Sequence, residues 1–410
     1  MEFLSADWII TCDKEFTIHK DSTIVFDEKI IQIDTNEKIQ EKYPDVHIQY
    51  QGVNSVIMPG FINAHVHLEF SANKTTLSYG NFVKWLFSVI EHREDLISNA
   101  TKELIDKELK NMIRNGTTTI GAISSYGFDM DSCKQSDLNV VYFTEALGSK
   151  SDMIDTLFLD FKEKLNSAIS LKDDKFIPAV AIHSPYSTHP FLVREILKIA
   201  KDKDLAISSH FMESKAENDW LNYSKGEFTT FFNNFLNQKT SLCKPYEFLN
   251  LFKNHTNLSF THCVQANKDE IKQIKDLNAT IIHCVNSNRL LNNTKLDLNN
   301  LDNINLAIGT DGLSSNNSLN MFDELRNALF MHCDIDIDLL AQKLLIAATA
   351  GGAIALGLKN KGSLDINNDA DLITFNLQDK VINQETLAQN IILHIKRSRK
   401  TYIKGKNAIS

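Results

Sequence analysis

The sequence has 410 residues, 43% of them hydrophobic, which is enough chain for one large domain and a smaller one. Its formal net charge is -9, with 43 Lys and Arg against 52 Asp and Glu and no basic run, so nucleic acid and anionic membrane surfaces are not expected partners. No apolar run is long enough to span a membrane, and the first residues lack the basic start of a signal peptide, which predicts a cytoplasmic location. The six cysteines are scattered without a Cys-X-X-Cys pair, which argues against a disulfide framework and a cysteine zinc site.

The two ends of the chain are rich in short β-branched runs typical of strands. They lie at residues 7–11, 22–26 and 29–33 near the start, and at residues 371–375 and 401–406 near the end. A sheet of so few strands cannot bury both faces alone, so each end needs a partner. We therefore expect residues 1–57 and 359–410 to pack together as one β-sandwich, with the rest of the chain inserted between them.

The middle of the chain, residues 58–358, alternates strands and helices. Its helical patterns include residues 82–109, 191–200 and 268–277. Eight strands are predicted, the first at the His-X-His sequence and the others at 117–120, 140–143, 177–182, 205–208, 258–260, 280–282 and 306–308. This count and length predict a (β/α)8 barrel. A doubly wound open sheet is the competing architecture, but no Gly-X-Gly-X-X-Gly follows the first strand.

Histidines and carboxylates follow several of these strands. His65-Val66-His67 comes first, and residues two apart in an extended chain point to the same side, so both imidazoles can reach one metal ion. Later predicted strands are followed by polar residues in the same way, namely His183, His210 with Glu213, His262, His283 and Asp311. A single such histidine is more often a satisfied buried residue than a ligand, but barrels of this kind build active sites where their strands end. Five successive strands ending this way favour an active site.

Together these residues resemble the amidohydrolase superfamily. The matching stretches are His65-Val66-His67, His210 with Glu213, His262, His283-Cys284-Val285-Asn286-Ser287-Asn288, Gly309-Thr310-Asp311-Gly312 and Asp369-Ala370-Asp371-Leu372-Ile373. The resemblance covers essentially the whole chain and is strongest to the branch that deaminates cytosine, guanine and adenosine derivatives. Val285 is a departure, because the family often has proline after His-Cys.

The resemblance, in agreement with the chemistry of the side chains, implies a role for each residue. His65, His67, His210 and Asp311 would hold one divalent ion, zinc or ferrous iron, with a water in the open position. Asp311 would also accept a proton from that water, Glu213 would protonate a ring nitrogen, and His262 would orient the water. Glu213 could instead be only a carboxylate at a helix start. No lysine stands at the end of the fourth barrel strand to bridge a second ion, so we expect a mononuclear site.

Substrate choice depends on other residues. Trp85 would cover a planar base, although aromatic stripes are often core. The resemblance assigns ribose binding to Glu94, with Glu91 as a rival, and a base contact to His183. With 185–190 and 286–291, these residues resemble the 6-aminodeoxyfutalosine deaminases of menaquinone biosynthesis, whose substrate carries a carboxyphenyl ketone. Arg289 is the candidate partner of that carboxylate, or else a surface arginine.

The expected function is therefore hydrolytic deamination of an adenine nucleoside, with release of ammonia. The alternatives are a 5′-methylthioadenosine or S-adenosylhomocysteine deaminase, a guanine or cytosine deaminase, a cyclic amidohydrolase, and a metal-binding barrel without catalysis. The presence of Glu213 and Asp311 speaks against the last of these. The partner is a small-molecule nucleoside, and the family resemblance also implies a homodimer.

Overall fold

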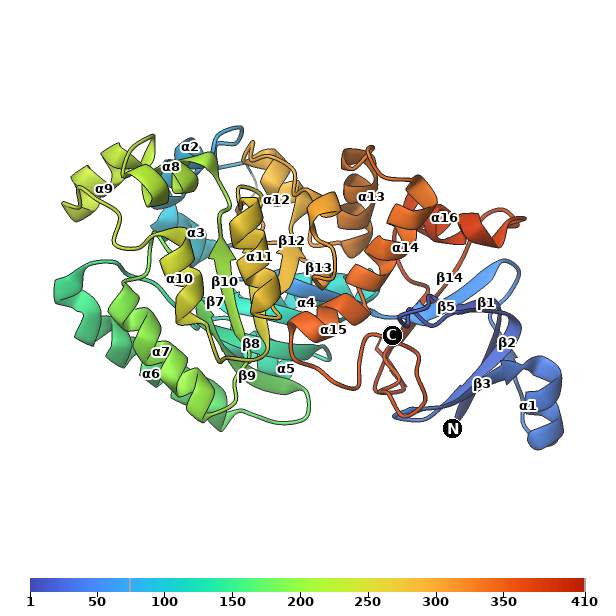
Figure 1. The fold of residues 1–410 in the computed structure, drawn as a ribbon. Coiled ribbons are helices and arrows are strands. Elements are labelled where there is room, and N and C mark those ends of the chain that lie inside the picture. The colour runs from blue at the N-terminus through green and yellow to red at the C-terminus, as the bar shows by residue number, and fades with distance from the viewer. Residues whose placement is uncertain (74, 409–410) are drawn as a thin grey trace.

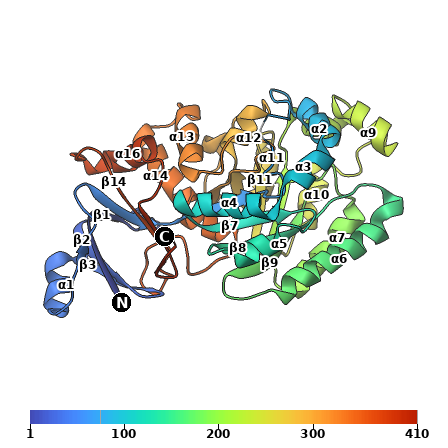
Figure 2. The same cartoon turned by 180° about the vertical axis from the view of Figure 1, so that it is seen from behind.

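The computed structural model describes residues 1–73 and 75–408, which form a large parallel barrel with a smaller sheet at one end (Figure 1). The smaller sheet lies at the opposite end of the molecule from helix α9, and both chain termini lie on its side (Figures 1 and 2). No helix among the described residues is long and apolar enough to cross a membrane. All six cysteines are free thiols, and only Cys333 is exposed.

The smaller sheet contains strands from both ends of the chain, as predicted. Its members are β1 (Glu2–Ile10), β2 (Ile18–Phe26), β3 (Ile30–Thr35), β4 (Gln49–Tyr50), β5 (Ser55–Pro59), β14 (Leu372–Asn376), β15 (Lys400–Ile403) and β16 (Lys406–Asn407). The ends meet where β14 runs antiparallel to β5, with Leu372 opposite Pro59 and Thr374 opposite Ile57. Hydrogen bonds link all eight strands into one continuous sheet. The two chain ends therefore pair within one sheet, where the sequence predicted a sandwich.

The barrel strands follow one another in sequence order, each parallel to the next. They are β6 (Phe61–Val66), β7 (Thr117–Ser124), β8 (Asn139–Ala146), β9 (Phe176–Ile182), β10 (Ile207–Phe211), β11 (Leu258–His262), β12 (Thr280–His283) and β13 (Leu306–Ile308). The last strand returns to the first, because the backbone N–H groups of Thr310 and Asp311 donate to the His65 carbonyl at 3.1 and 3.0 Å. This order and closure exclude the doubly wound sheet.

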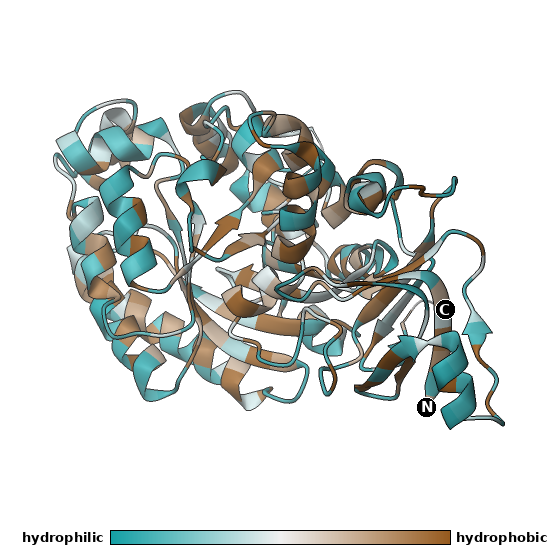
Figure 3. Cartoon of the chain, turned by 45° about the vertical axis from the view of Figure 1, so that its right-hand side comes forward, coloured by the Kyte–Doolittle hydropathy of each residue, from teal (hydrophilic) through white to brown (hydrophobic). Residues whose placement is uncertain are grey.

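Helices cover the outside of the barrel, with hydrophilic residues on their outer faces (Figure 3). The α-helices are α1 (Asn36–Lys42), α2 (Phe82–Glu91), α3 (Arg93–Asn99), α4 (Lys102–Arg114), α5 (Met130–Gln135), α6 (Ile154–Ser170), α7 (Pro190–Asp202), α8 (Lys215–Tyr223), α9 (Phe228–Leu236), α10 (Pro245–Leu251), α11 (Lys268–Asp276), α12 (Val285–Leu290), α13 (Met321–Met331), α14 (Ile337–Ala347), α15 (Ala350–Ala355) and α16 (Leu387–His394). Short 3₁₀ turns occupy η1 (Ser151–Met153), η2 (Leu298–Asn300) and η3 (Gln384–Thr386).

Helix α7 shows why such segments are helical. Pro190 stands in its first turn, where a missing N–H costs nothing, and the His189 side chain caps the helix by accepting from the Phe191 N–H. The residues that it buries recur at three- and four-residue spacing, namely Leu192, Val193, Ile196, Leu197 and Ala200.

The helix expected over residues 82–109 is wrong in one respect, because the structure divides this segment into α2, α3 and α4. His92 ends α2, and its N–H donates back to the Ser88 carbonyl. Thr101 then starts α4, since its hydroxyl caps the N–H of Leu104. Apolar spacing continues through both breaks, so periodicity alone did not reveal them. The breaks turn the chain so that α2 and the start of α3 form one wall of the cavity described below.

The barrel and the smaller sheet share one hydrophobic core. Phe322 of α13 packs edge-on against Phe61 of β6, with ring centres 4.7 Å apart, and lies 6.1 Å from Phe375 of β14. Arg326 of α13 also donates to the carbonyl of Ile395, which follows α16. The division at residues 57/58 and 358/359 remains a prediction, because β5 belongs to the smaller sheet while its chain continues directly into the barrel.

Candidate active site

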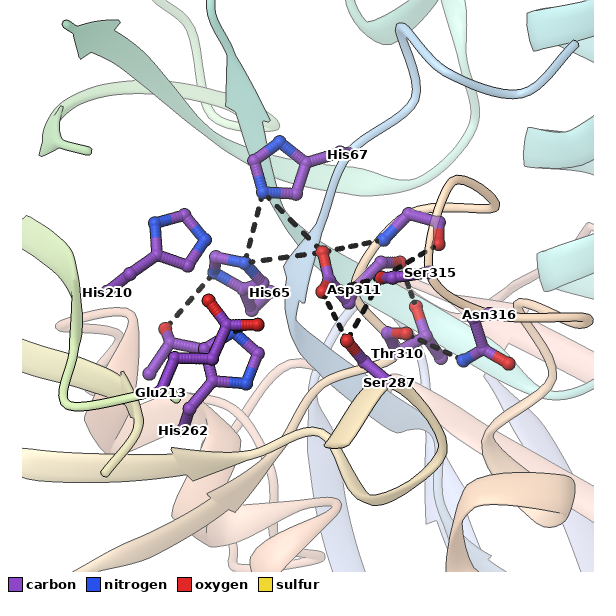
Figure 4. Close-up of polar contacts among 12 residues, drawn as sticks. His65, His67, His210, Glu213, His262, Ser287, Thr310, Asp311, Ser315 and Asn316 are labelled. Atoms are coloured by element: carbon purple, nitrogen blue, oxygen red, sulfur yellow. Dashed lines mark hydrogen bonds and ion pairs between the residues drawn. The ribbon is translucent and has the colours of Figure 1, made fainter. Parts of the chain in front are cut away.

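Three barrel strands carry the predicted metal ligands to one point where the strands end (Figure 4). His65 and His67 belong to the β6 segment, His210 to β10, and Asp311 follows β13. The Nε2 atoms of His65 and His67 are 3.2 Å apart, and they lie 3.9 and 3.7 Å from Oδ1 of Asp311. The ligand atoms of the three histidines all lie within 4.8 Å of one another. The structure thus brings together all four residues predicted to hold the metal.

Hydrogen bonds from outside the cluster hold these side chains in orientation. Nδ1 of His210 donates to the carbonyl of His183 at 2.7 Å, which leaves its Nε2 free toward the cluster. Nδ1 of His65 contacts the Thr261 hydroxyl at 3.2 Å. Oδ2 of Asp311 accepts from two serine hydroxyls, each at 2.8 Å, which are those of Ser287 and Ser315. The cluster is therefore preorganised.

The protonation states of the cluster fit a divalent cation. Burial lowers the pKa of His65 and of His67, so both imidazoles are neutral and can ligate. Burial alone would raise the pKa of Asp311, but the surrounding histidines outweigh it and lower that pKa below its ordinary value. Three imidazoles and one carboxylate form a donor set suited to one zinc or ferrous ion.

Glu213 and His262 lie beside this cluster, as predicted. Burial, together with the charges of Asp311 and Glu217, raises the pKa of Glu213 well above its ordinary value, which favours the protonated form of this carboxyl. Nε2 of His262 lies 3.6 Å from Oε1 of Glu213. Nδ1 of His262 contacts the Asn288 amide oxygen at 2.9 Å, and burial lowers the pKa of this histidine to about 3.

Left-handed backbone conformations occur at the strand ends that carry these groups. Met212, His262 and Asp311 have φ values of 49°, 74° and 57°, which residues other than glycine rarely adopt. Such conformations cost about 1–3 kcal/mol each and are retained where the surroundings enforce them. One source of enforcement is Glu217 in α8, whose carboxylate accepts from the N–H groups of Met212 and Glu213 at 3.1 and 2.7 Å.

A cavity of about 620 Å³ opens above the cluster. His67, His210, Glu213 and Asp311 are among the residues that line it. Its walls are largely apolar and come from α2, α6 and α9, and they include Leu86, Val89, Ile90, Leu157, Phe161, Phe231 and Phe232. A cavity of this volume with apolar walls and a few polar groups is typical of a small-molecule site.

Besides Glu213, two residues predicted to bind substrate line this cavity, namely Trp85 and His183. Trp85 does so with its indole fixed, because Nε1 donates to the Ser314 carbonyl at 2.8 Å. His183 lines it too, with Nδ1 held 2.6 Å from the Ser187 hydroxyl, and burial lowers the pKa of His183 to about 4. Both therefore present defined faces to a ligand.

The structure does not bring Glu94 or Arg289 to the cavity. Glu94 is exposed in the first turn of α3, and Glu91 is exposed at the end of α2. Arg289 is exposed in α12. Among the described residues, none of these three lines the cavity wall. Sequence position near a barrel strand was too coarse to decide which side chains of a helix point inward.

Glu145 is a site residue that the sequence reasoning missed. It stands near the end of β8, is buried and lines the cavity. Its Oε2 accepts from the Ser125 hydroxyl, and its Oε1 has no hydrogen-bond partner among the described residues. Burial would raise the pKa of Glu145, but His183, His67 and His210 outweigh it and lower that pKa. The strand predicted at 140–143 stopped short of Glu145; extending it would have placed this residue at a strand end like the others.

Comparison with known proteins agrees with this geometry. Residues 56–408 match the model of the amidohydrolase family. The chain is 46% identical over 393 residues to the aminodeoxyfutalosine deaminase of a Nitratiruptor species, covering 96% of each chain. It is 35% identical to a protein of Helicobacter pylori named adenosine deaminase, over the full length of both. It also superposes on the crystal structure of Helicobacter pylori aminofutalosine deaminase in complex with methylthio-coformycin, with a TM-score of 0.94, 35% identity and full coverage of both chains. The family match and the shared fold place this chain in the amidohydrolase family, as a hydrolase that acts on C–N bonds.

Proposed function

We propose that this protein is a metal-dependent deaminase that hydrolyses the adenine of a modified nucleoside to hypoxanthine and releases ammonia. The observation that carries the proposal is the buried Glu213 carboxyl, which lies beside the histidine and aspartate cluster and lines the apolar cavity above it. Hydrolytic deamination of a purine needs a general acid that can protonate a ring nitrogen, placed next to a metal site. The deaminases among the relatives support this assignment.

His65, His67, His210 and Asp311 would hold one divalent ion, zinc or ferrous iron, which supplies a Lewis acid that lowers the pKa of water. Glu213 donates its proton to a nitrogen of the adenine ring, so that the carbon bearing the amino group becomes electrophilic. Asp311, kept deprotonated by its histidine neighbours, accepts a proton from the attacking water. His262 orients that water through Nε2, which makes no hydrogen bond to the described residues. Asp311 then passes this proton to the departing amine, and the Glu213 carboxylate takes up the remaining hydroxyl proton as the carbonyl forms, so both carboxyl groups return to their starting states.

The cavity walls determine how the nucleoside lies. Trp85 covers one face of the base and His183 contacts its edge, as the resemblance implies. For the ribose hydroxyls, the Glu145 carboxylate inside the cavity is better placed than the exposed Glu94, because its free Oε1 can accept hydrogen bonds. Within this class we propose 6-aminodeoxyfutalosine as the substrate, in menaquinone biosynthesis, as the similarity to the Nitratiruptor enzyme supports. A homodimer remains a prediction.

A second candidate function is deamination of 5′-methylthioadenosine or S-adenosylhomocysteine. It is favoured by the structural relative, which is in complex with methylthio-coformycin, and by the apolar wall of the cavity, which suits a methylthio group. The two candidates share the chemistry at the metal and differ in the group at the 5′ end of the sugar.

Steady-state ammonia release from 6-aminodeoxyfutalosine, 5′-methylthioadenosine, S-adenosylhomocysteine and adenosine tests both candidates. We expect the highest kcat/KM for 6-aminodeoxyfutalosine, because remote binding energy can be used at the reacting carbon. Glu213→Gln is the matched control, since it keeps the size of the side chain but cannot transfer the proton; its turnover should fall by roughly 10² to 10⁴ while bound metal persists. A wild-type preference for S-adenosylhomocysteine would overturn the substrate assignment, and normal turnover in Glu213→Gln would overturn the mechanism.

A further inference from the structure

The cavity changes character from its floor to its mouth. The floor consists of buried ligands such as His67 and His210, and the walls above them are apolar. Only two Lys or Arg side chains line the described cavity, and these are Arg93 from the start of α3 and Lys164 from α6. Arg93 is exposed, which places it at the mouth. A ligand whose reacting end lies on the floor would therefore extend past apolar side chains toward a positive charge.

Both cations contact one short loop, residues 125–127, which follows β7. Glu69 holds this loop from inside, because its carboxylate accepts the N–H groups of Ser125, Tyr126 and Gly127 at distances between 2.7 and 3.0 Å. Lys164 holds it from outside, with Nζ donating to the Ser125 carbonyl at 2.8 Å. The backbone that carries the Tyr126 ring is therefore held in place on both sides, where the ring lines the cavity.

The two cations differ in how their charges are compensated. Lys164 is paired with Asp160, with 2.6 Å between Nζ and Oδ2, and Asp160 also lines the cavity. Arg93 lies over the Tyr126 ring, with its guanidinium carbon 5.0 Å from the ring centre. It has no carboxylate partner within 4.0 Å among the described side chains, although Glu94 and Asp95 follow it in sequence. The contact with Tyr126 restrains the guanidinium, and the guanidinium has further N–H groups that can bind an anion.

The orientation of a bound nucleoside follows from the reaction. The carbon that loses the amino group must face the metal ligands on the floor, so the sugar and its 5′ substituent point toward the mouth. The apolar side chains of Leu86, Val89, Leu157 and Phe161 line the cavity through which such a substituent would pass, and the exposed Arg93 lines it too. The walls suit a flat apolar group, and the guanidinium suits a carboxylate at the end of that group.

We propose that Arg93, which lies over the Tyr126 ring, is the binding site for a terminal carboxylate on the 5′ substituent of the nucleoside. The proposal rests on the deaminase function proposed above and names the residue that selects among its substrates. Arg93 takes this role in place of Arg289, which is exposed on α12 and does not line the described cavity. On this proposal, Arg93 determines substrate specificity without touching a reacting atom.

Two nucleosides that differ only in this charge test the proposal. One is an adenine nucleoside whose 5′ substituent ends in a benzoate, and the other is its neutral carboxamide. We expect the wild type to favour the benzoate by roughly ten- to a hundredfold in kcat/KM, since hydrogen bonds to charged groups are the stronger ones. Arg93→Met should remove most of this preference by weakening the benzoate alone, while Arg93→Lys should retain part of it. Arg289→Met is the matched control and should keep the wild-type ratio.

Binding measured without turnover separates this proposal from the deaminase assignment. Calorimetric titration of both nucleosides into metal-loaded Glu213→Gln, with and without Arg93→Met, should give the same discrimination in Kd. If no adenine nucleoside is deaminated but this discrimination is found, the deaminase assignment fails and the carboxylate site stands. Equal weakening of both nucleosides by Arg93→Met, or an unchanged benzoate preference, would overturn the role of Arg93.

Discussion

At the scale of single residues, the two ring nitrogens of His210 have different roles: one fixes the orientation of the ring and the other faces the metal position. Its Nδ1 is committed to the His183 carbonyl, so only Nε2 can face the metal position. The His183 carbonyl is thereby tied to a ligand, while the His183 side chain faces the cavity. A change at His210 therefore affects both the donor set and the strand end that carries His183.

We predict that His210→Ala removes most of the bound metal and abolishes ammonia release, because three remaining ligands hold an ion far less well than four. Elemental analysis of the purified variant measures the first effect and steady-state kinetics the second. His47→Ala is the control, since His47 is exposed and remote from the cluster, and it should keep one equivalent of metal. One undiminished equivalent in His210→Ala would remove this residue from the ligand set, and a second equivalent in the wild type would contradict the mononuclear site.

At the scale of elements, the closure between β6 and β13 sets the distance between metal ligands on the two strands. Asn63 bridges the seam, because its amide donates to the Thr310 hydroxyl at 2.7 Å and its oxygen accepts the Thr310 N–H at 3.1 Å. His65 and Asp311 each lie within two residues of this bridge. The glycine at 309 permits the close approach, since an added Cβ would lie 2.8 Å from Cβ of His65.

We predict that Asn63→Ala destabilises the fold by about 1–3 kcal/mol, because it leaves the buried Thr310 hydroxyl without its donor and removes an acceptor of the Thr310 N–H. Turnover should fall as well, since the seam carries ligands on both sides. Urea-induced unfolding and kcat report the two effects. Asn99→Ala, at an exposed position in α3, serves as the comparison and should change stability by less than about 0.5 kcal/mol. If the two variants are equally stable, the seam does not depend on Asn63.

At the scale of the whole molecule, a buried ion pair connects the smaller sheet to the barrel. Lys361 contacts Asp371 at 2.6 Å and Asp369 at 2.7 Å, and the side chains of Lys361 and Asp371 are only 7% and 5% exposed. Asp371 also accepts from the amide of Asn139, the first residue of barrel strand β8, at 2.9 Å. The C-terminal strands are therefore linked to the barrel by a polar network beneath the shared core.

We predict that Lys361→Met lowers the free energy of unfolding by about 3–5 kcal/mol, because it leaves a buried carboxylate without its cation. Lys272→Met makes the same chemical change in the surface pair with Asp276, whose side chains are 71% and 61% exposed, and should cost at most about 1 kcal/mol. Thermal or urea unfolding of the two variants provides the measurement. Similar losses in both would show that the junction does not rest on this pair. Metal content should stay unchanged in either variant.

Local sequence was sufficient to predict most of the strands and the barrel. Alternation along a strand places His65 and His67 on one side, and parallel strands in a barrel bring their ends together. Strand-end position and the family resemblance together therefore predicted that His210 and Asp311 would lie beside them. The association of the two chain ends was also predictable, because a few strands cannot bury their apolar faces without a partner.

Only the tertiary structure decided which side chains reach the cavity beyond the metal. Arg93 and Glu94 are neighbours in sequence, yet Arg93 lines the cavity and Glu94 does not, because the break at His92 sets the rotation of α3. Lys164 of α6 and Tyr126 of the loop after β7 both line the cavity, and Lys164 holds that loop through the Ser125 carbonyl. Such contacts join segments far apart in the chain, and their geometry depends on helix rotation, which carries no local sequence signal. For this reason the sequence determined the chemistry at the floor of the site, while the fold decided what the rest of the pocket can recognise.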